Sequence, residues 1–478
     1  MKKILYAAAE CSPFIKTGGL GAVVGSLPKQ LKKRGYDVRI VLPAYECMDE
    51  KWKSQMDVSL PFPVHMGWRR YPITINTLEY EGITCYFLAC DHYYSGESPY
   101  TEMWMDIEKF CFFCKAVLEM LSYLEFEPDI IHCHDWQTGL IPVYLKTLYQ
   151  NNPYYKNIKT IMTLHNMCFQ GITDVETMKD ITGLPKEVFA FDKLEFYGSG
   201  NMLKGGIAFA DKITTVSDTY AREIQEEEYG EGLWELLRYR NKDLCGIVNG
   251  IDYQIYSPLQ DAYIKYHYNV NTFRKAKKKN KLFLQKEAGL PVGKHIFTVC
   301  IISRLTEQKG LDLLIPHLND FLRHDVQLYI LGSGEKRYEA IFASVKTRYP
   351  DKVYFETEYS DQMAKYMYAG CDATLMPSKF EPCGLSQLMA LRYGTVPIVR
   401  LTGGLKDTVQ LYDERYHTGT GFGFREYSME ALRESLRQAL QLYQERPEEW
   451  NGIAERGMRE NYSWNTSCKK YEALYESM

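Results

Sequence analysis

The sequence predicts an α/β protein built from two doubly wound domains in series. The 478 residues are about three times the usual length of a single domain. Segments with strand and helix patterns alternate along the chain, which is typical of parallel sheets. Near residues 245–260 this alternation is interrupted by the turn signal Asn249-Gly250 and a polar, tyrosine-rich stretch, and then it restarts. We therefore expect one domain on each side of this boundary.

The first half of the chain begins with a buried strand. The start resembles a signal peptide for a few residues, but its apolar stretch is short and Glu10 interrupts it. A helix is expected at Ala22–Arg34, where apolar residues recur with helical spacing before Gly35. The strands expected in this half are Ile4–Ala9, Val38–Leu42, Asp129–His134 and Thr160–His165.

The second half repeats the same alternation after the boundary. Short runs rich in apolar and β-branched residues are separated by helical segments. The strands expected here are Ile296–Ile302, Val326–Leu331, Lys352–Phe355, Ala373–Met376 and Thr395–Val399. The second domain is therefore also expected to contain a parallel sheet.

Composition argues against several classes of protein. The net charge is −4, whereas nucleic-acid binders usually have a basic excess, so we expect no nucleic-acid partner. No apolar run reaches the roughly 18 residues of a membrane-spanning helix, and no membrane partner is expected. The 13 cysteines are odd in number and scattered, which favours reduced thiols and a cytoplasmic location.

Three local clusters have both a structural and a functional interpretation. Cys111 and Cys114 have the spacing of a redox pair, but their apolar, helix-like surroundings favour core packing. His132-Cys133-His134 resembles a metal site, but successive residues of a strand face opposite sides of the sheet, so the three side chains cannot converge. The basic run Arg274–Lys281 favours a solvated helix face, with a patch for an anionic partner as the alternative.

The chemistry is expected where strands end, because open parallel sheets bind ligands outside the carboxyl ends of their strands. Lys16 and the glycines Gly18 and Gly19 follow the first strand, where backbone N–H groups and a cation can meet an anion. Arg304 and Lys309 follow the first strand of the second domain, and two cations there can clamp a diphosphate.

Two further motifs of the second domain also follow predicted strands. Glu381 lies between Phe380 and Pro382 just before a helix, where a carboxylate can grip sugar hydroxyls. Thr402-Gly403-Gly404 opens another helix with glycines. A phosphorylated donor bound between two domains explains these motifs together. A hydrolase would need a second carboxylate across the scissile bond, and no equally convincing acid is present in this domain.

Longer motifs standing in a fixed order make the resemblance specific. They are Lys16–Leu20, His134–Gln137, Thr163–Asn166, Leu194–Gly198, Lys204–Ile207, Asn249–Asp252, Ser303–Gly310, Phe380–Leu385, Arg392–Thr395 and Thr402–Leu405. With this set the chain closely resembles bacterial glycogen synthase and plant starch synthase, the ADP-glucose-dependent glucan glucosyltransferases. The match extends to Tyr462-Ser463-Trp464.

The resemblance implies a GT-B architecture, in which two Rossmann-like domains face each other across a cleft. The N-terminal domain, residues 1–245, is then the acceptor side, and residues 246–455 bind the nucleotide sugar. The C-terminal segment, residues 456–478, is expected to cross back to the first domain. The resemblance also implies a retaining transfer of glucose from ADP-glucose to an α-1,4-glucan or maltooligosaccharide, with no metal ion or other cofactor.

Roles carried over by matching position fall on both domains. Lys16, Gly18 and Gly19 should meet the donor's diphosphate or glucose. Asp135 and His165 should line the reacting face of the first domain. The positions expected to contact the donor in the second domain are Asn249, Arg304, Lys309, Tyr359, Glu381, Cys383, Gly384, Leu385, Thr402, Gly403 and Gly404. Among these, the resemblance implies that Arg304 and Lys309 should neutralise the diphosphate, that Glu381 should hold glucose hydroxyls and that Tyr359 should pack on the base.

The chain also departs from the family pattern, mostly on the acceptor side. Ala22 replaces a usual Asp, Ser95 a usual Arg, and Tyr256-Ser257 a usual Trp-Asn. An active ADP-glucose glucan synthase is the leading hypothesis. A glucan-binding or regulatory paralogue of low activity is one alternative, and a GT-B transferase with another donor or acceptor is the other.

Overall fold

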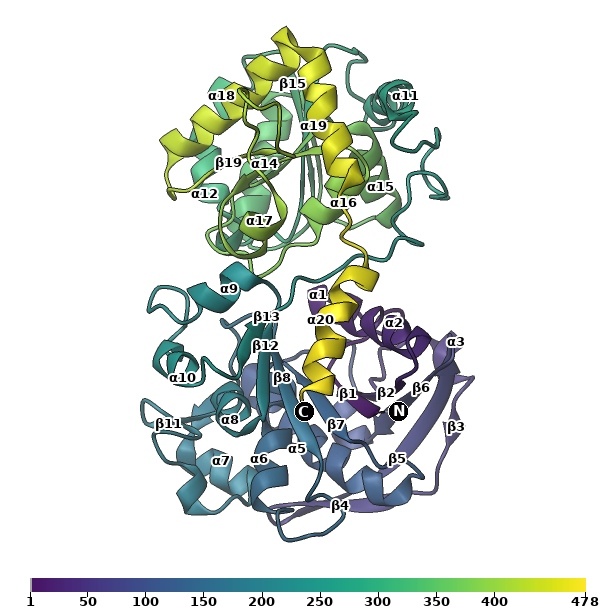
Figure 1. Cartoon of the computed structure of the whole chain (residues 1–478), viewed down its shortest axis with the longest axis vertical. Helices are drawn as coiled ribbons and strands as arrows, with labels where there is room; N and C mark the ends of the chain where they lie inside the picture. Colours follow the sequence, from purple (N-terminus) through teal and green to yellow (C-terminus); the bar gives the residue numbers. More distant parts are fainter. Residues whose placement is uncertain (1) are drawn as a thin grey trace. The chain divides into compact units, whose positions relative to one another are not determined.

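The chain folds into two compact α/β units, described here from a computed structural model that covers residues 2–478 (Figure 1). Unit 1 runs to Ile247 and also contains Trp464–Met478, and unit 2 is Val248–Ser463. The division after Ile247 lies close to the expected one after residue 245. The return to unit 1 comes at Trp464, later than the expected residue 456, because 456 lies inside a helix of unit 2, Pro447–Arg459.

Unit 1 is centred on a sheet whose core strands are parallel. Its strand order is β13-β12-β8-β7-β1-β2-β6, so the order reverses on either side of β1. Apart from the partly exposed edge strand β13, these strands are mostly buried, as expected for strands covered on both faces. Their bounds are β1 (Lys3–Ala7), β2 (Asp37–Pro43), β6 (Ile83–Ala89), β7 (Ile130–His134), β8 (Lys159–Leu164), β12 (Lys212–Thr215) and β13 (Leu244–Gly246). All four strands predicted in this half are therefore present.

An antiparallel extension of this sheet was not predicted. The long strand β5 (Arg69–Tyr80) pairs with β6 through a two-residue turn, Glu81-Gly82, in which both residues have positive φ. β3 (Asp57–Val58) and β4 (Phe62–Met66) both pair with β5. Most of β5 is only partly buried, which an antiparallel edge tolerates. A small separate sheet contains β9 (Ile172–Asp174), β10 (Glu195–Phe196) and β11 (Ser199–Asn201).

The helices of unit 1 correct one prediction and confirm another. The helix predicted over Ala22–Arg34 is two short helices, because Gly25 ends the first and Pro28 sits in the first turn of the second. The buried pair Cys111 and Cys114 lies inside α5, which confirms core packing. The helices are α1 (Gly19–Val24), α2 (Leu27–Lys33), α3 (Glu50–Lys53), α4 (Asp91–Tyr94), α5 (Met103–Met120), α6 (Leu140–Thr147), α7 (Val175–Thr182), α8 (Met202–Phe209), α9 (Asp218–Glu223) and α10 (Trp234–Tyr239).

The final helix, α20 (Trp464–Glu476), packs on unit 1 (Figure 1). Its Glu472 pairs with Arg34 at the end of α2. The buried hydroxyl of Tyr475 bonds the Nδ1 atom of His132 on β7 at 2.8 Å. The end of the chain is thereby tied to the centre of the unit 1 sheet.

Unit 2 contains one fully parallel six-stranded sheet. The order is β16-β15-β14-β17-β18-β19, so it reverses between β14 and β17. All five predicted strands are present, and the additional β19 has only three residues. The bounds are β14 (Phe297–Ile302), β15 (Val326–Leu331), β16 (Val353–Glu356), β17 (Ala373–Met376), β18 (Val396–Arg400) and β19 (Phe422–Phe424). The order reversal places the switch point, where such sheets bind ligands, at the carboxyl ends of β14 and β17.

The basic run Arg274–Lys281, which was expected to form a solvated helix face, is only partly solvated. The basic run forms the start of α11, where Lys275 and Lys278 are exposed but Lys281 is only 2% exposed. Apolar residues at helical spacing hold this side of α11 against the core. The helices are α11 (Phe273–Glu287), α12 (Leu311–Leu314), α13 (Leu318–Phe321), α14 (Lys336–Arg348), α15 (Asp361–Gly370), α16 (Ser386–Arg392), α17 (Gly403–Thr408), α18 (Met429–Glu445) and α19 (Pro447–Arg459).

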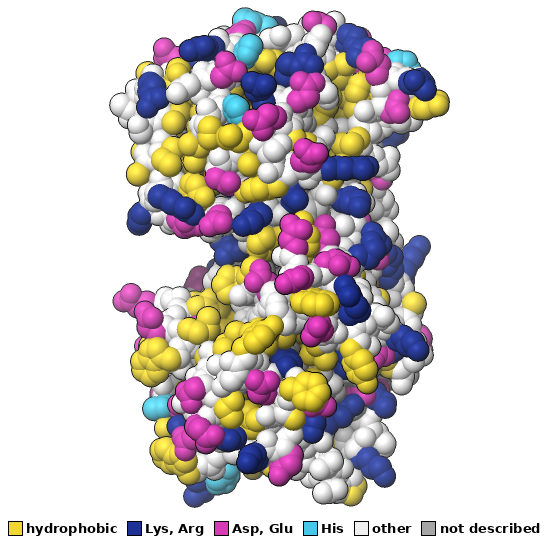
Figure 2. Space-filling view, turned by 90° about the vertical axis from the view of Figure 1, so that its left-hand side faces the viewer, with side chains coloured by type: hydrophobic (Ala, Val, Ile, Leu, Met, Phe, Trp, Pro, Cys, Tyr) yellow, Lys and Arg dark blue, Asp and Glu magenta, His cyan; other side chains and the backbone are white. Residues whose placement is uncertain are grey.

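The surface carries charges of both signs. Figure 2 shows acidic and basic side chains interspersed over the face it presents, in keeping with the small net charge of −4. None of the helices in residues 2–478 is long and apolar enough to cross a membrane.

Candidate active site

A buried carboxylate organises the loop that follows β1. The Oε2 atom of Glu10 accepts the backbone N–H groups of Thr17 and Gly18 at 2.6 and 3.2 Å. Its Oε1 atom accepts the hydroxyls of Thr17 and Tyr100 at 2.6 and 2.7 Å. The loop is thus fixed, while Lys16 stays exposed and a Cβ atom at Gly18 would meet open space. Sequence reasoning missed Glu10, although a Glu interrupting an apolar strand was the visible signal.

Asp135 and His165 come together at the neighbouring strand ends. Asp135 directly follows β7 with a positive φ of 57°, and its Oδ1 atom accepts the backbone N–H of His165 at 2.7 Å. Burial raises the pKa of the Asp135 carboxyl to about 7, although bonds from backbone N–H groups oppose the shift. The strained backbone and the perturbed carboxyl mark this strand end as a candidate site.

A second histidine orients His165. The Nδ1 atom of buried His134 lies 3.0 Å from Nε2 of His165. The Nε2 atom of His134 has no partner among the described residues. One ring must donate and the other accept across this contact, so the tautomers of the two neutral histidines are coupled: a proton on Nδ1 of His134 requires an unprotonated Nε2 on His165. The same period-of-two pattern that opposes a metal site predicts that His132 and His134 share a face.

The buried histidines predict an acid-sensitive fold. Burial lowers the pKa of His132 and His165 to about 3, compared with roughly 6.5 in an unfolded chain. Between these pH values the unfolded chain binds more protons, so acidification destabilises the fold by about 1.4 kcal/mol per pH unit and histidine. The raised pKa of Asp135 has the opposite effect. Between about pH 4 and pH 7 the folded chain binds the extra proton, so acidification stabilises the fold there and offsets the loss due to one histidine.

Urea unfolding followed across this pH range measures the effect. We expect the midpoint to fall steadily as pH is lowered below about 6.5, and His132→Phe to flatten this dependence. A midpoint that is independent of pH, or that rises on acidification, would contradict the assigned protonation states.

In unit 2 a carboxylate and an ammonium meet at the switch point. The Nζ atom of Lys309 lies 2.6 Å from Oε2 of Glu381, which also accepts the Ser378 hydroxyl at 2.9 Å. Glu381 follows β17 and Lys309 follows β14, so the two strand ends bring together residues far apart in the sequence. Glu381 is 6% exposed, and its remaining oxygen, Oε1, can accept hydroxyl groups of a ligand.

The glycine motif after β18 packs directly on the backbone of Glu381. Gly403 has a φ of 45°, and a Cβ atom there would clash with the carbonyl oxygen of Glu381. The backbone N–H of Gly404 reaches the carbonyls of Glu381 and Pro382, each at 3.1 Å. Thr402 is the buried N-cap residue of α17. Only glycine allows this approach, which explains why the two motifs occur together.

Asn249 and Cys383 are neighbours in the same region. The Cys383 thiol accepts hydrogen bonds from Asn249, and burial raises the pKa of this thiol to about 12. Asn249 is 4% exposed, and its Oδ1 atom has no partner among the described residues. Gly384 follows with a φ of 71°, and Leu385 is the N-cap residue of α16. An unpaired buried acceptor here is satisfied most simply by a ligand hydroxyl.

Two predicted residues do not contact this cluster through their side chains. Arg304 follows β14 and is exposed, with no side-chain partner in the part of the chain that is described. Tyr359 follows β16 and is 57% exposed. Both nevertheless lie at the carboxyl edge of the unit 2 sheet. The edge therefore offers a carboxylate, two cations and an exposed aromatic ring, which suits a phosphorylated, hydroxyl-rich ligand.

Comparison with known proteins agrees with this arrangement. Residues 3–239 match the family described as starch synthase catalytic domain, and residues 284–456 match glycosyl transferases group 1. The chain is 51% identical to a glycogen synthase of Lachnoclostridium phytofermentans over 478 residues, covering 100% of both chains. It is 44% identical to a glycogen synthase of Thermotoga maritima over 480 residues, covering 99% of this chain and 98% of that one.

A solved structure is similar over the same length. The catalytic domain of starch synthase IV from Arabidopsis thaliana, bound to ADP and acarbose, is 31% identical with a TM-score of 0.92, covering 100% of this chain and 99% of that one. Fold and matches together define a glycosyltransferase of GT-B architecture. Within that class, the chain belongs to the glycogen synthase and starch synthase family.

Proposed function

We propose that this enzyme transfers glucose from ADP-glucose to the non-reducing end of an α-1,4-glucan, with retention of configuration and without a metal ion. The ion pair of Lys309 and Glu381 beside the Gly403-Gly404 backbone is the observation that carries the proposal. Family membership and a 31% identical structure bound to ADP and acarbose support it. Thirteen free cysteines, most of them buried, support a reducing, cytoplasmic location.

The proposed donor site lies in unit 2. Arg304 and Lys309 neutralise the diphosphate, and the Thr402-Gly403-Gly404 segment, whose Gly404 N–H bonds the carbonyls of Glu381 and Pro382, forms the wall beside the phosphates. Glu381 and Asn249 hold glucose hydroxyls, with Cys383-Gly384-Leu385 shaping the same wall, and Tyr359 packs on the base. The leaving diphosphate gains charge as the bond to glucose breaks, and preorganised donors of this kind are each worth about 3 kcal/mol.

Residues of unit 1 act on the reacting sugar in this proposal. Lys16 and the loop segment Gly18-Gly19 meet the phosphate or glucose, while Glu10 fixes this loop through the N–H groups of Thr17 and Gly18. Asp135 and His165 line the face of the oxocarbenium-like sugar. The acceptor hydroxyl attacks the sugar from the side on which the diphosphate departs, and the departing phosphate takes the proton of this hydroxyl. Retention of configuration follows from attack on the face that the leaving group vacates.

An elongation assay tests the proposal. ADP-glucose with maltooligosaccharide or glycogen should give longer α-1,4-linked chains, and a chelator should leave the rate unchanged. ADP binding without elongation of any glucan would instead favour the regulatory paralogue suggested by Ala22 and Ser95. Elongation with UDP-glucose alone would favour a transferase with another donor.

Glu10 gives a prediction for the unit 1 loop. Glu10→Ala leaves the N–H groups of Thr17 and Gly18 unpaired, so we expect transfer to fall by about tenfold or more. Glu10→Gln should keep most of the activity, because the amide oxygen accepts the N–H groups while its NH₂ donates to the hydroxyls. Glu46→Ala is the matched control, since exposed Glu46 accepts a single N–H, that of Gly96. Equal activity of Glu10→Ala and Glu46→Ala would contradict this role.

A further inference from the structure

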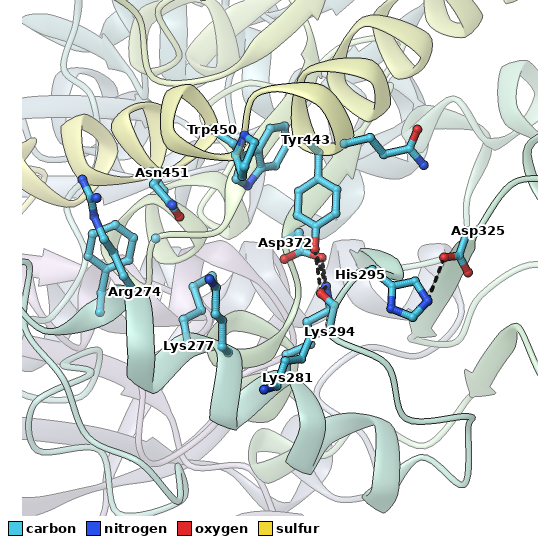
Figure 3. Close-up of a pocket in the computed structure, with 16 residues that line it drawn as sticks. Arg274, Lys277, Lys281, Lys294, His295, Asp325, Asp372, Tyr443, Trp450 and Asn451 are labelled. Carbon is cyan, nitrogen blue, oxygen red and sulfur yellow. Dashed lines mark hydrogen bonds and ion pairs between the residues drawn. The ribbon is translucent and has the colours of Figure 1, made fainter.

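A pocket of about 400 Å³ lies in unit 2 at the edge opposite the candidate active site (Figure 3). Its lining includes residues that lie just before strands: His295 two residues before β14, Asp325 directly before β15 and Asp372 directly before β17. Glu381 and Lys309, by contrast, follow strands. Because all six strands are parallel, the pocket occupies the amino edge of the sheet and the candidate donor site the carboxyl edge. The pocket is therefore a separate site.

The lining of this amino-edge pocket is strongly basic. Five lysines and arginines line it, against two aspartates. Figure 3 shows Lys277 reaching from α11 toward Asn451 and Trp450 of α19. The cationic members are Arg274, Lys277, Lys278, Lys281 and Lys294.

The deep part of the pocket holds two ammonium groups but one carboxylate. The Nζ atom of Lys281 lies 2.5 Å from Oδ2 of Asp372, and the same carboxylate oxygen accepts the N–H and hydroxyl of Thr298. Lys277 interacts with the charge of Asp372 only through space and forms no ion pair with it. The partly buried ammonium group of Lys277 therefore has no anion of its own, which is costly where water is largely excluded.

The contacts of Lys277 satisfy its hydrogen bonds but not its charge. Its Nζ atom donates to the carbonyls of Tyr368 and Ala369 at 3.1 and 3.3 Å, and to the Thr395 hydroxyl at 2.6 Å. It thus caps the last turn of α15. Burial lowers the pKa of Lys277 to about 8, against the opposing influence of Asp372. An anion in the pocket would supply the missing negative charge.

Donors at the rim are available to hold such an anion. Lys278 and Lys294 are exposed, and their ammonium groups have no partner in the described chain. The amide of Asn451 is likewise unpaired there. Arg274 is partly engaged by Glu448 at 2.7 Å, and His295 by Asp325 at 3.3 Å. Trp450 adds an apolar wall. The volume falls within the range of small-molecule sites.

We propose that this amino-edge pocket binds a small phosphate-bearing metabolite, with its phosphate held by Lys278, Lys294 and Asn451 over the uncompensated charge of Lys277. A phosphate group suits this lining because it offers several strong acceptor oxygens and up to two negative charges. The site is independent of the proposed glucosyl transfer.

Calorimetric titration of the whole protein with glycerol 3-phosphate tests this proposal, with glycerol as the uncharged comparison. The wild type should bind the phosphate saturably, with a dissociation constant of about 1 mM or lower. Lys277→Met and the double variant Lys278→Gln with Lys294→Gln should each weaken binding by about tenfold or more. The double variant alters only exposed side chains, so it decides the matter if Lys277→Met does not fold.

Two control variants distinguish binding in this pocket from binding elsewhere on the protein. Lys275→Gln removes a charge from the exposed side of α11 outside the pocket, and Arg304→Gln removes one from the candidate donor site. Both should leave the affinity within about twofold of the wild type. Equal affinity in pocket variants and controls, loss of binding in Arg304→Gln alone, or no saturable binding would each overturn the proposal.

Discussion

Glu381→Ala should give a folded protein that is almost inactive in glucosyl transfer. The carboxylate is buried beside Lys309 at the ends of β14 and β17, and its free oxygen can accept sugar hydroxyls. Removing it takes away a contact to the reacting sugar and also leaves the Lys309 ammonium without its carboxylate partner. Loss of one preorganised polar group at a reaction centre typically costs about 100- to 1000-fold in turnover.

The comparison variants for this position separate charge from shape. Glu381→Gln keeps the shape and still accepts hydrogen bonds, so its activity should lie between those of the alanine variant and the wild type. Glu307→Gln changes an exposed carboxylate near the same strand end, which pairs with Lys379 and Arg337, and should stay within about twofold of the wild type. Turnover of Glu381→Ala near the wild-type value, with circular dichroism unchanged, would remove this residue from the site.

Asp135→Asn is expected to have the second large effect. The carboxylate stands at the end of β7 in a strained conformation, accepts the N–H of His165, and faces the reacting sugar in our proposal. Asparagine preserves the size but removes the negative charge that would stabilise an oxocarbenium-like sugar. We expect turnover to fall by about 100-fold. Because the pKa of Asp135 is raised to about 7, wild-type turnover should also fall as pH drops below that value.

The opposite end of the same strand supplies the control. Asp129 precedes β7 and accepts the backbone N–H of Lys3 at 2.7 Å, far from the strand's carboxyl end. Asp129→Asn should retain both the turnover and the acid limb of the pH profile. If Asp135→Asn kept the wild-type acid limb, the limb would belong to another group and the assignment would be wrong.

The parallel cores of both units could be read from the sequence because their strands are near-continuous apolar runs. β3 and β5 were missed because they are short or half-exposed, and β4 because its alternating pattern covers only five residues and contains Pro63. The break between α1 and α2 was missed because apolar spacing continues across Gly25. Local pattern therefore defines buried elements better than edges and helix boundaries.

The residues of the candidate site likewise differ in whether the sequence could predict them. Lys309 and Glu381 were predictable because each follows a buried strand, and strand order then brings them together. Glu10 and His134 could not be predicted, because they act through other residues. Glu10 fixes the loop that contains Thr17, and His134 contacts the ring of His165. Such supporting contacts depend on side-chain directions across strands that no spacing along the chain reveals.

ADP binding measured by calorimetry tests most directly whether the carboxyl edge of the unit 2 sheet grips a diphosphate. Arg304→Met and Lys309→Met should each weaken binding by about tenfold or more, since each removes a charge-assisted contact. Lys379→Met, an exposed lysine nearby that pairs with Glu307, should change it little. Equal ADP affinity in all three variants and the wild type would contradict the account.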